Sequence, residues 1–474
     1  MSIQYITMVK KAVDCNGLSF DDCQLAIVRS AVSKIEKTIG YRTTQLPSLQ
    51  HIIKIVEQFI QSSKVVCYGG TAINNLLPKS KQFYNKNTDI PDYDFYSSNA
   101  LKDAKRLADI YVKNGYTEVE AKSGQHHGTY KVFVNFIAIA DITQLPDLLF
   151  SSIYDTSIVV NKIHYAHPNF LRMSMYLELS RPEGDVSRWE KVLSRLNALN
   201  SEYPPEKIHC NKSFARSMHN SSNNKLIYNI TKQVFINAKC VFFGGFALNI
   251  YANKKEGTPD FDVIIENPRE VIATLQELLS KKHIEISVEK HDAIGEIIPQ
   301  HYELKYGKDT FATLYEPIAC HNYNIIKIRN QDVSIATIDT MLSFYLAFLY
   351  IDKPYYRQFV GRIECAVKLL TSLHRSKQLA QKGVWRRFSM TCHGKQKTLA
   401  DIKQEKSQKY EELKSSKSSK EYEEWFLSYR GTGALKKPTK TMKKINKSKK
   451  SMTQTKIKKM GRYRSTKKKT IKKK

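Results

Sequence analysis

The sequence predicts an α+β protein in which one kind of domain, a mixed sheet with flanking helices, occurs twice. A pattern of strand, Gly-Gly, helix and Asp-x-Asp occupies residues 64–97, and the same pattern returns in residues 241–264. Stretches with helical periodicity surround these motifs, first in residues 1–60 and again from residue 331. The recurrence of one pattern at two places in a chain indicates an internal duplication.

The first copy begins with a strand-like apolar run that ends at Tyr68. Gly69 and Gly70 follow, and Thr71 opens a segment with helical periodicity. Glycines at a strand-to-helix junction let the backbone approach a phosphate, whose negative charge the helix N-terminus stabilises. These two glycines and the Thr71 hydroxyl are therefore predicted to contact the phosphates of a nucleotide.

Asp92 and Asp94 lie two positions apart in a β-favouring context, so their side chains point to the same face of a strand. Asp141 ends a later strand-like run and is expected beside them. Like charges this close are costly unless a cation binds between them, and three carboxylates suit a two-metal site for Mg²⁺ or Mn²⁺. A phosphate-binding turn next to such a site is typical of nucleotidyl transfer. The alternative for Asp141 is a cap for the helix that follows it.

The second copy has Asp260 and Asp262 as its Asp-x-Asp pair, and Glu316 is expected to take the place of Asp141. Phe246 follows the second pair of glycines, so a polar contact is missing where phosphates should lie. We therefore predict that the first copy catalyses and that the second is a structural or RNA-binding relic. An active second copy is the alternative.

Residues 168–196 combine helical periodicity with many basic and aromatic side chains. Such a mixture favours contacts with phosphates or nucleobases, although a charged helix is more commonly a solvated face. Positive charge near the triphosphate is expected from this segment as a whole, including Arg172, Arg181 and Arg195. The residues predicted to contact the nucleotide are Tyr176, Ser180, Arg188 and Lys191.

The net charge of +31 is uneven along the 474 residues. Nineteen Lys and Arg residues lie in residues 436–474, which contain no acid, so the rest of the chain carries about +12. A folded part this basic indicates a polyanionic partner, most simply RNA. The alternative is a basic surface kept for solubility. The eight cysteines form no CxxC pair, which predicts reduced cysteines, no zinc site and an intracellular protein, with Cys392-His393 incidental.

Four segments are expected along the chain: an N-terminal helical segment (1–45), a catalytic domain (46–200), a second domain (201–395), and a charged linker with a disordered Lys-rich tail (396–474). The tail could bind RNA through its charge or act as a nuclear localisation signal, and the sequence leaves both open. The longest apolar run is too short to span a bilayer, and no signal sequence is recognisable, so we expect a soluble protein without a membrane partner.

The motifs resemble those of the catalytic poly(A) polymerase subunit encoded by large nucleocytoplasmic DNA viruses, including poxviruses, asfarviruses and mimiviruses. The resemblance covers roughly residues 45–350. It rests on YGGTAIN (68–74), PDYDFYS (91–97), ADIT (140–143), ELSRPEGDVSRWEKVLSRL (178–196) and the second unit, FFGGFALNIY with PDFDVI.

This resemblance implies a duplicated polymerase-β-like nucleotidyltransferase fold, a divalent metal, ATP as substrate and extension of an mRNA 3′ end with release of pyrophosphate. It also implies Asp92, Asp94 and Asp141 as metal ligands. A homodimer or a separate processivity subunit would be the protein partner, in the host cytoplasm (a viral factory) or in the virion. Two rivals stay open: another template-independent nucleotidyltransferase (CCA-adding, uridylyl-transferring or oligonucleotide-synthesising), and a catalytically dead RNA-binding scaffold.

Overall fold

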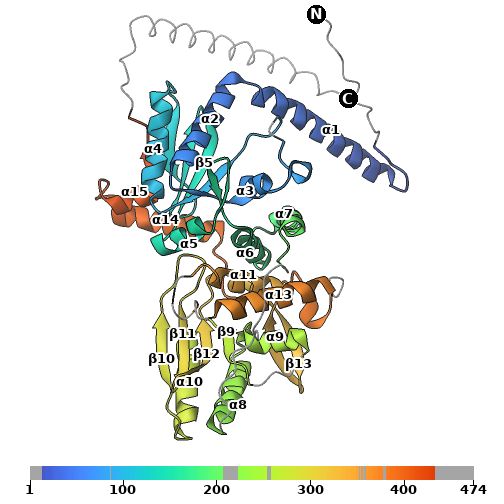
Figure 1. Cartoon of the computed structure of the whole chain (residues 1–474), viewed down its shortest axis with the longest axis vertical. Helices are drawn as coiled ribbons and strands as arrows, with labels where there is room; N and C mark the ends of the chain where they lie inside the picture. Colours follow the sequence, from blue (N-terminus) through green and yellow to red (C-terminus); the bar gives the residue numbers. More distant parts are fainter. Residues whose placement is uncertain are drawn as a thin grey trace, which may run out of the picture.

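The computed structural model describes residues 13–85, 87–205, 222–253, 258–351, 359–376 and 381–432, together with Lys353 and Tyr356. Within these residues the chain forms two halves, each built on an eight-stranded sheet (Figure 1). The Lys-rich tail expected in residues 436–474 lies outside the described residues.

The first half runs from two N-terminal helices to the helix that ends at Glu202 (Figure 1). Its elements are α1 (Phe20–Thr44), α2 (Pro47–Ser62), β1 (Val66–Cys67), α3 (Gly69–Leu76), η1 (Lys79–Lys81), β2 (Tyr93–Ser97), α4 (Ala100–Lys113), β3 (Val119–Ser123), β4 (Thr129–Val134), β5 (Ile137–Gln144), α5 (Asp147–Asp155), β6 (Ile158–Val160), β7 (Ile163–Tyr165), α6 (Pro168–Leu179), η2 (Val186–Arg188) and α7 (Trp189–Glu202).

The second half repeats this succession and adds a C-terminal extension. Its elements are α8 (Ser222–Asn237), β8 (Val241–Phe242), α9 (Gly245–Ala252), β9 (Phe261–Ile264), α10 (Pro268–Ser280), β10 (Ser287–His291), β11 (His301–Tyr306), β12 (Asp309–Tyr315), β13 (His321–Ile328), β14 (Gln331–Ala336), α11 (Ile338–Phe348), α13 (Val360–Ser376), η4 (Gly383–Trp385), β15 (Cys392–His393), α14 (Leu399–Leu413), α15 (Lys420–Phe426) and β16 (Ser428–Tyr429).

The strand orders of the two sheets confirm the predicted duplication. The first sheet has the order β16-β3-β4-β5-β2-β1-β7-β6, and the second has the order β10-β11-β12-β9-β8-β14-β13-β15. If the two late edge strands β16 and β15 are set aside, the two orders are the same throughout, and at the end of the sheet β7 with β6 corresponds to β14 with β13. Both sheets are mixed, as β2 with β5 and β9 with β12 are parallel pairs among antiparallel neighbours.

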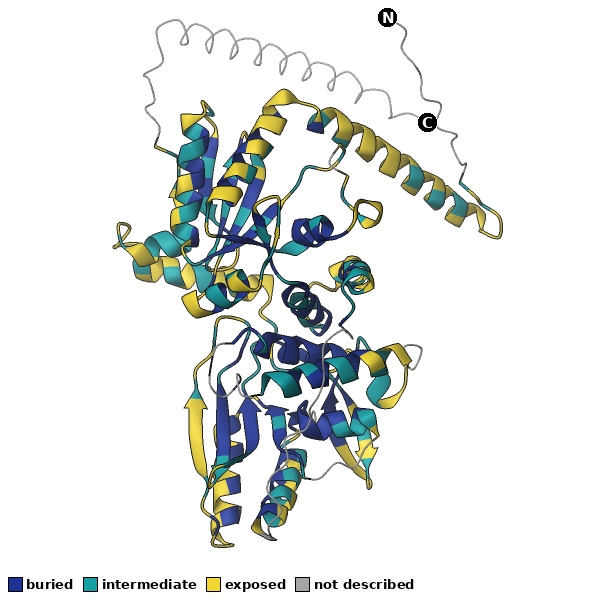
Figure 2. Cartoon of the chain, viewed as in Figure 1, coloured by how far each residue is buried: buried dark blue, intermediate teal, exposed yellow. Residues whose placement is uncertain are grey.

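The two halves pack against each other through α6 and α11 (Figure 1). Every residue of α11 is buried, Asp339 included, which explains why apolar side chains occur on all sides of Ile338–Phe348 rather than along one stripe (Figure 2). The main-chain N–H of Asn322 also donates a 2.8 Å hydrogen bond to the carbonyl of Ser180, across the same interface. The two cores are therefore continuous.

The C-terminal extension differs from the expectation of a linker and a disordered tail after residue 396. Residues 399–432 return to the first half, where β16 pairs with β3 and extends that sheet. Trp425 packs on His127 with ring centroids 4.3 Å apart, and the Tyr429 hydroxyl donates a 2.9 Å hydrogen bond to Asp109. The aromatic residues of this segment hold it in place, although its Lys, Glu and Ser content resembles that of a solvated chain.

The expectation of fully reduced cysteines is also wrong. Cys15 is joined to Cys23 and Cys320 to Cys392 by disulfides, and Cys365 is disulfide-bonded as well. Pairing of β13 with β15 brings Cys320 and Cys392 together, although they are 72 positions apart. Among the described residues Cys67 and Cys240 are free thiols, and both are buried.

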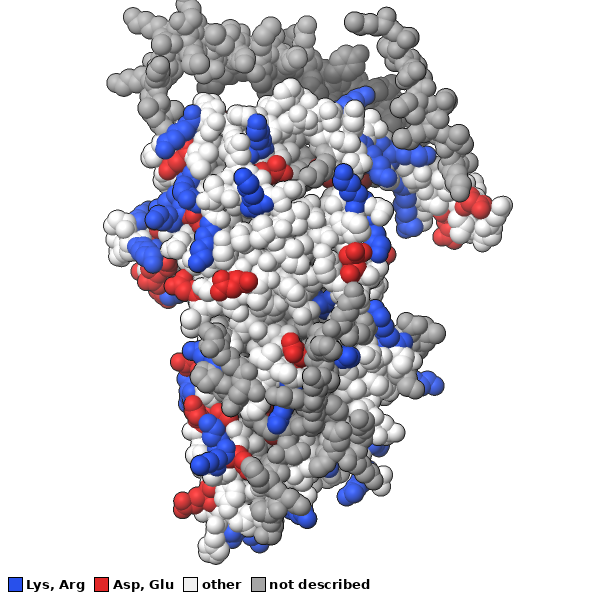
Figure 3. Space-filling view, in the orientation of Figure 1, with Lys and Arg blue, Asp and Glu red and all other residues white. Residues whose placement is uncertain are grey.

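On the face seen in Figure 3, the charge is spread out rather than concentrated. Lys and Arg side chains are scattered over the visible face of both halves, with acidic residues among them (Figure 3). Over the described stretches, we find no helix with both the length and the apolar character needed to cross a bilayer.

Candidate active site

The three aspartates predicted from the sequence lie together on two central strands of the first sheet. Strands β2 and β5 are parallel, and Asp94 is the register partner of Asp141. Directly paired residues on neighbouring strands share a face, so these two carboxylates lie side by side. Asp92 immediately precedes β2 and, two positions before Asp94, points to the same side.

Burial and mutual repulsion both act on these carboxylates. The pKa of Asp94 rises from 3.8 to about 7, first because burial disfavours its charge and then because Asp92 and Asp141 repel it. Lys131 and Arg188 partly oppose that rise. The pKa of Asp92 is also raised, by withdrawal from water and by Asp141. The cluster thus carries more negative charge than its own surroundings neutralise.

Asp141 has one satisfied and one unsatisfied oxygen. Its Oδ2 pairs with the ammonium of Lys131, the residue opposite it on β4, whereas its Oδ1 is buried without a hydrogen-bond partner. A buried carboxylate oxygen without a donor is costly. An orphaned oxygen beside two further carboxylates is the donor set that Mg²⁺ or Mn²⁺ prefers, so the residues fit a divalent cation.

The glycine turn approaches the carboxylates closely. Gly69 has a φ of +71°, and a Cβ placed on it would meet Asp94 Oδ2 at 2.5 Å. Only glycine combines this backbone conformation with this proximity. A Cβ on Gly70 would meet the Tyr84 hydroxyl at 2.8 Å and the Arg195 guanidinium at 2.9 Å. The two glycines therefore keep the N-terminus of α3 open between the acidic cluster and a basic side chain.

The side chain of Thr71 forms a hydrogen bond with the main chain of the site. Its hydroxyl donates a 2.6 Å hydrogen bond to the carbonyl of Asp92, and the side chain is buried. A hydroxyl has one proton to donate. In this structure Thr71 therefore positions Asp92 and does not offer its proton to a phosphate, which differs from the direct contact expected from the sequence.

Basic side chains from α7 and its N-terminal turn face the aspartates. Lys191 lies near Asp92 and Arg188 near Asp94, as their electrostatic influence on these carboxylates shows. The pKa of Lys191 is lowered, first by Arg195 and then by burial and Arg188, because three cations gather here. Such a cluster attracts a polyphosphate. Arg188 and Lys191 thus lie near the carboxylates, and their contact with a nucleotide stays a prediction.

Two other predicted nucleotide contacts lie in the interface between the halves. Tyr176 and Ser180 are 1% and 0% exposed. The Ser180 hydroxyl donates to the carbonyl of Leu177, and Tyr176 is packed near Asp339 and Arg387. Both side chains are withdrawn from solvent and occupied within the protein, so the nucleotide-contact prediction for both is wrong. In the sequence of α6, the apolar pattern is too weak to show whether this face of the helix is buried or lines a polar site.

Arg172 and Arg181 are also structural. Arg172 is 1% exposed and donates to Asn200, Asn169 and the carbonyl of Tyr203. Arg181 is withdrawn from water, which lowers its pKa despite the nearby Glu296 and Glu178. Sequence reasoning instead missed Lys131 and Tyr84. The strand alternation of residues 129–134 could have placed Lys131 opposite Asp141, but nothing local identifies Tyr84.

The second copy has no carboxylate at the position of Asp141. Strand β9 pairs with β12 so that Asp262 lies opposite Thr313, which is the position of Asp141 in the first copy. Glu316 follows the end of β12, so its expected correspondence with Asp141 is wrong by three residues. In β11, the antiparallel neighbour of β12, Glu303 lies opposite Thr313. At the matching position of the first copy, Lys131 lies opposite Asp141.

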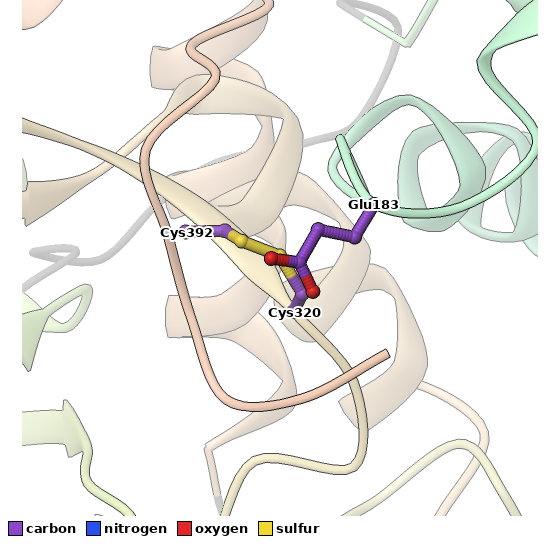
Figure 4. A group of neighbouring side chains, drawn as sticks. All are labelled: Glu183, Cys320 and Cys392. Carbon is purple, nitrogen blue, oxygen red and sulfur yellow. A yellow bond between two sulfur atoms is a disulfide. The ribbon is translucent and has the colours of Figure 1, made fainter. Parts of the chain in front are cut away.

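Two groups of side chains, neither of them the aspartate cluster, have ligand atoms within 4.8 Å of one another among the described residues. Glu183 lies within 4.8 Å of Cys320 and Cys392, and its carboxylate points at their sulfurs (Figure 4). These sulfurs are bonded to each other, so they offer no thiolate to a metal.

Glu289, His291 and Glu303 form the other group. Lys305 already pairs with both of its carboxylates, with Nζ 2.7 Å from Glu289 and 3.0 Å from Glu303. The aspartate cluster of the first copy is therefore the stronger candidate for a divalent cation.

Part of the first half matches a known family. Residues 54–185 match the family model described as Poly(A) polymerase catalytic subunit. A protein assigned as a poly(A) polymerase catalytic subunit in Acanthamoeba polyphaga mimivirus is 33% identical over 158 residues, which are 33% of this chain and 27% of the relative. One from African swine fever virus (isolate Tick/Malawi/Lil 20-1/1983) is 28% identical over 179 residues, 36% of this chain and 37% of the relative.

The likeness in structure extends further than the likeness in sequence. The crystal structure of the Megavirus polyadenylate synthase superposes with a TM-score of 0.71 and 20% identity, covering 86% of each chain. At this identity the match establishes the fold. The matched part of this chain spans about a third of the length of the curated relatives. The resemblance predicted from the motifs is confirmed, with sequence support over residues 54–185.

Proposed function

We propose that this protein is the catalytic subunit of a template-independent poly(A) polymerase, which transfers AMP from ATP to an mRNA 3′ end and releases pyrophosphate. The observation that carries the proposal is the pairing of Asp94 with Asp141 across parallel strands, beside the Gly69 turn. The match of residues 54–185 to the poly(A) polymerase catalytic subunit family supports this choice among reactions that such a site could perform.

The aspartates and the basic side chains would have different roles in the reaction. Asp92, Asp94 and Asp141 would hold Mg²⁺ or Mn²⁺, which supplies Lewis-acid activation of the primer hydroxyl and screens the phosphate charge. The Gly69–Gly70 turn lets the main chain of α3 lie close to the phosphates. Arg188, Lys191 and Arg195 attract the triphosphate and balance the charge of the departing pyrophosphate.

The second copy would serve as scaffold. Thr313 cannot replace the carboxylate of Asp141, and Glu303 has the opposite charge to Lys131 at the matching position. RNA and ATP are the proposed substrates, and a second copy of the chain or a separate processivity subunit is the proposed protein partner. By analogy with the viral relatives, the proposed setting is the cytoplasmic viral factory or the virion.

Primer extension tests the proposal. A short oligo-RNA is incubated with Mg²⁺ or Mn²⁺ and each nucleotide separately, with wild type beside Asp94→Ala and the matched second-copy variant Asp262→Ala. We expect a long ladder with ATP alone, lost in Asp94→Ala and kept in Asp262→Ala.

Other outcomes would assign the alternatives. Comparable extension with other nucleotides would indicate a different template-independent nucleotidyltransferase. RNA binding without incorporation of any nucleotide would indicate a catalytically dead scaffold. Loss of extension in Asp262→Ala alone would move the chemistry to the second copy.

A further inference from the structure

The first sheet has a partly exposed face beside the aspartates. Helix α4 packs on β3, β4 and β5, and side chains along β4 alternate between buried and partly exposed. Val132 and Val134 are buried, whereas Lys131 and Phe133 are partly exposed. Because alternate side chains of a strand point to opposite faces, Lys131 and Phe133 lie on the face of the sheet away from α4.

A row of charged residues crosses this face from strand to strand. Lys122 on β3 is the register partner of Lys131 on β4. Lys131 is in turn the partner of Asp141 on β5, and Asp141 is the partner of Asp94 on β2. Neighbouring strands are about 5 Å apart, so Lys131 is about 5 Å and Lys122 about 10 Å from Asp141 along the row. The row therefore leads from the acidic cluster to two cations on one side of it.

Lys122 and Phe133 form a partly exposed patch at the outer end of this row. The Nζ atom of Lys122 lies 4.3 Å from the centroid of the Phe133 ring, and the Lys122 side chain is 44% exposed. Lys122 also pairs with Glu120 at 3.3 Å, but an ion pair this exposed contributes little to stability, so a phosphate can replace the carboxylate. A basic side chain beside an aromatic ring is the combination that binds single-stranded nucleic acid, through phosphate contacts and base stacking.

The basic residues of α7 lie on the other side of the aspartates. Helix α7 packs beside α3 and α6 (Figure 1), and α3 follows β1, whereas β4 and β3 lie beyond β5 in the sheet. In an in-line displacement the attacking and the leaving oxygen lie on opposite sides of the phosphorus. Since Arg188 and Lys191 are assigned to the triphosphate, the attacking hydroxyl would approach from the side of β4 and β3.

We propose that the patch of Lys122, Lys131 and Phe133 binds the 3′-terminal nucleotides of the RNA primer. Lys122 and Lys131 contact backbone phosphates, and Phe133 stacks on a base. The ion pair with Asp141 leaves the Lys131 ammonium further hydrogens to donate. The primer thus crosses β3 and β4 and ends at Asp141. This primer site depends on the proposed function, because the direction of approach follows from the reaction.

Binding of a short single-stranded oligoadenylate to the full chain, measured by fluorescence anisotropy without ATP at several salt concentrations, tests the phosphate contacts. Lys122→Ala should weaken binding about fivefold. It should also lower the slope of log K against log salt by about 0.7, the amount expected for one phosphate contact to a single strand. Lys113→Ala removes an exposed lysine at the end of α4, on the other side of the sheet, and is the matched control.

The control should bind like wild type. An affinity and a salt slope in Lys122→Ala equal to those of wild type would overturn the proposal. Equal losses in Lys122→Ala and Lys113→Ala would also overturn it, because they would indicate a general attraction by charge.

Phe133→Leu tests the stacking. Leu keeps much of the apolar bulk but has no aromatic face, so we expect binding about tenfold weaker. An abasic nucleotide among the last three of the RNA should weaken binding to wild type, and should weaken binding to Phe133→Leu no further. Losses that add in the variant would overturn the assignment of Phe133 to a base.

Steady-state primer extension tests the direction of approach. Lys122→Ala should raise the KM for the primer about fivefold and leave the KM for ATP unchanged, whereas Lys191→Ala should raise the KM for ATP. A raised KM for ATP in Lys122→Ala, with that for the primer unchanged, would overturn the primer site. A wild type that binds RNA through Lys122 but adds no nucleotide would instead overturn the proposed chemistry and leave the RNA contact established.

Discussion

Replacing Asp94 by Asn should stabilise the metal-free protein while abolishing its proposed activity. The Asp94 pKa of about 7, against 3.8 ordinarily, means that folding opposes the charge of this carboxyl group. Because the folded-state pKa is the higher one, the folded protein binds more protons between the two values, and stability falls as pH rises through that window. Asn has the same shape without the charge, so the variant should lack that decline.

The size of the effect follows from the pKa difference. One pKa unit corresponds to about 1.4 kcal/mol, so the full difference would be worth about 4 kcal/mol above pH 7. Lys131 and Arg188 lose part of an attractive interaction in the variant, which reduces the gain. We expect Asp94→Asn to raise the free energy of unfolding by about 2 kcal/mol at pH 8, and to leave it unchanged near pH 4.

Urea denaturation in chelator at several pH values measures this difference, and Asp155→Asn, at an exposed site at the end of α5, is the matched control. Added Mn²⁺ should then stabilise wild type but not Asp94→Asn, because a ligand that binds the folded state stabilises it. An Asp94→Asn protein less stable than wild type at pH 8, or stabilised by Mn²⁺ to the same extent, would refute the reasoning.

The remaining predictions concern the glycine turn and a buried ion pair. Gly69→Ala should reduce primer extension at least a hundredfold, because its Cβ would lie 2.5 Å from Asp94 Oδ2 at a φ of +71°; activity near that of wild type would contradict this geometry. Arg387→Met should lower the free energy of unfolding by about 3–5 kcal/mol, since Arg387 is the ion-pair partner of the fully buried Asp339. The urea midpoint measures it, and Arg387→Met/Asp339→Leu, which removes both charges, should recover most of the loss.

The sequence could predict the duplicated fold and the acidic cluster because both depend on local patterns. Asp92 and Asp94 share a face by strand alternation alone, and the order of strand, glycines and helix fixes their neighbours. The position of Thr313 could not be predicted in this way. Both copies have a register shift at the equivalent place, after Val132 and after Leu304, so it leaves the two registers alike. Thr313 is placed by its pairing with Asp262 across β9 and β12, which no local pattern of the sequence shows.

The prediction for the C-terminal extension was wrong for a different reason. Residues 399–432 have the composition of a solvated segment, and the side chains that hold them are few. Trp425 on His127 and Tyr429 on Asp109 connect parts of the chain about 300 positions apart, so no window of the sequence contains both partners. The predictions for Tyr176 and Ser180 were wrong for a similar reason, because that face of α6 is buried only through its packing on α11.

The difference between the two copies indicates which one is kept for chemistry. In the first, three carboxylates repel one another, and a buried oxygen of Asp141 lacks a donor, so the arrangement costs stability in the absence of a cation. In the second copy, Thr313 occupies the position of Asp141, so one of these negative charges is missing there. Glu303, in the position of Lys131, would make a third aspartate there still more costly. Mutations that relieve such a cost are common and are tolerated wherever function does not need the group. These differences support the proposal that the first copy, which keeps its unfavourable charges, is the catalytic one.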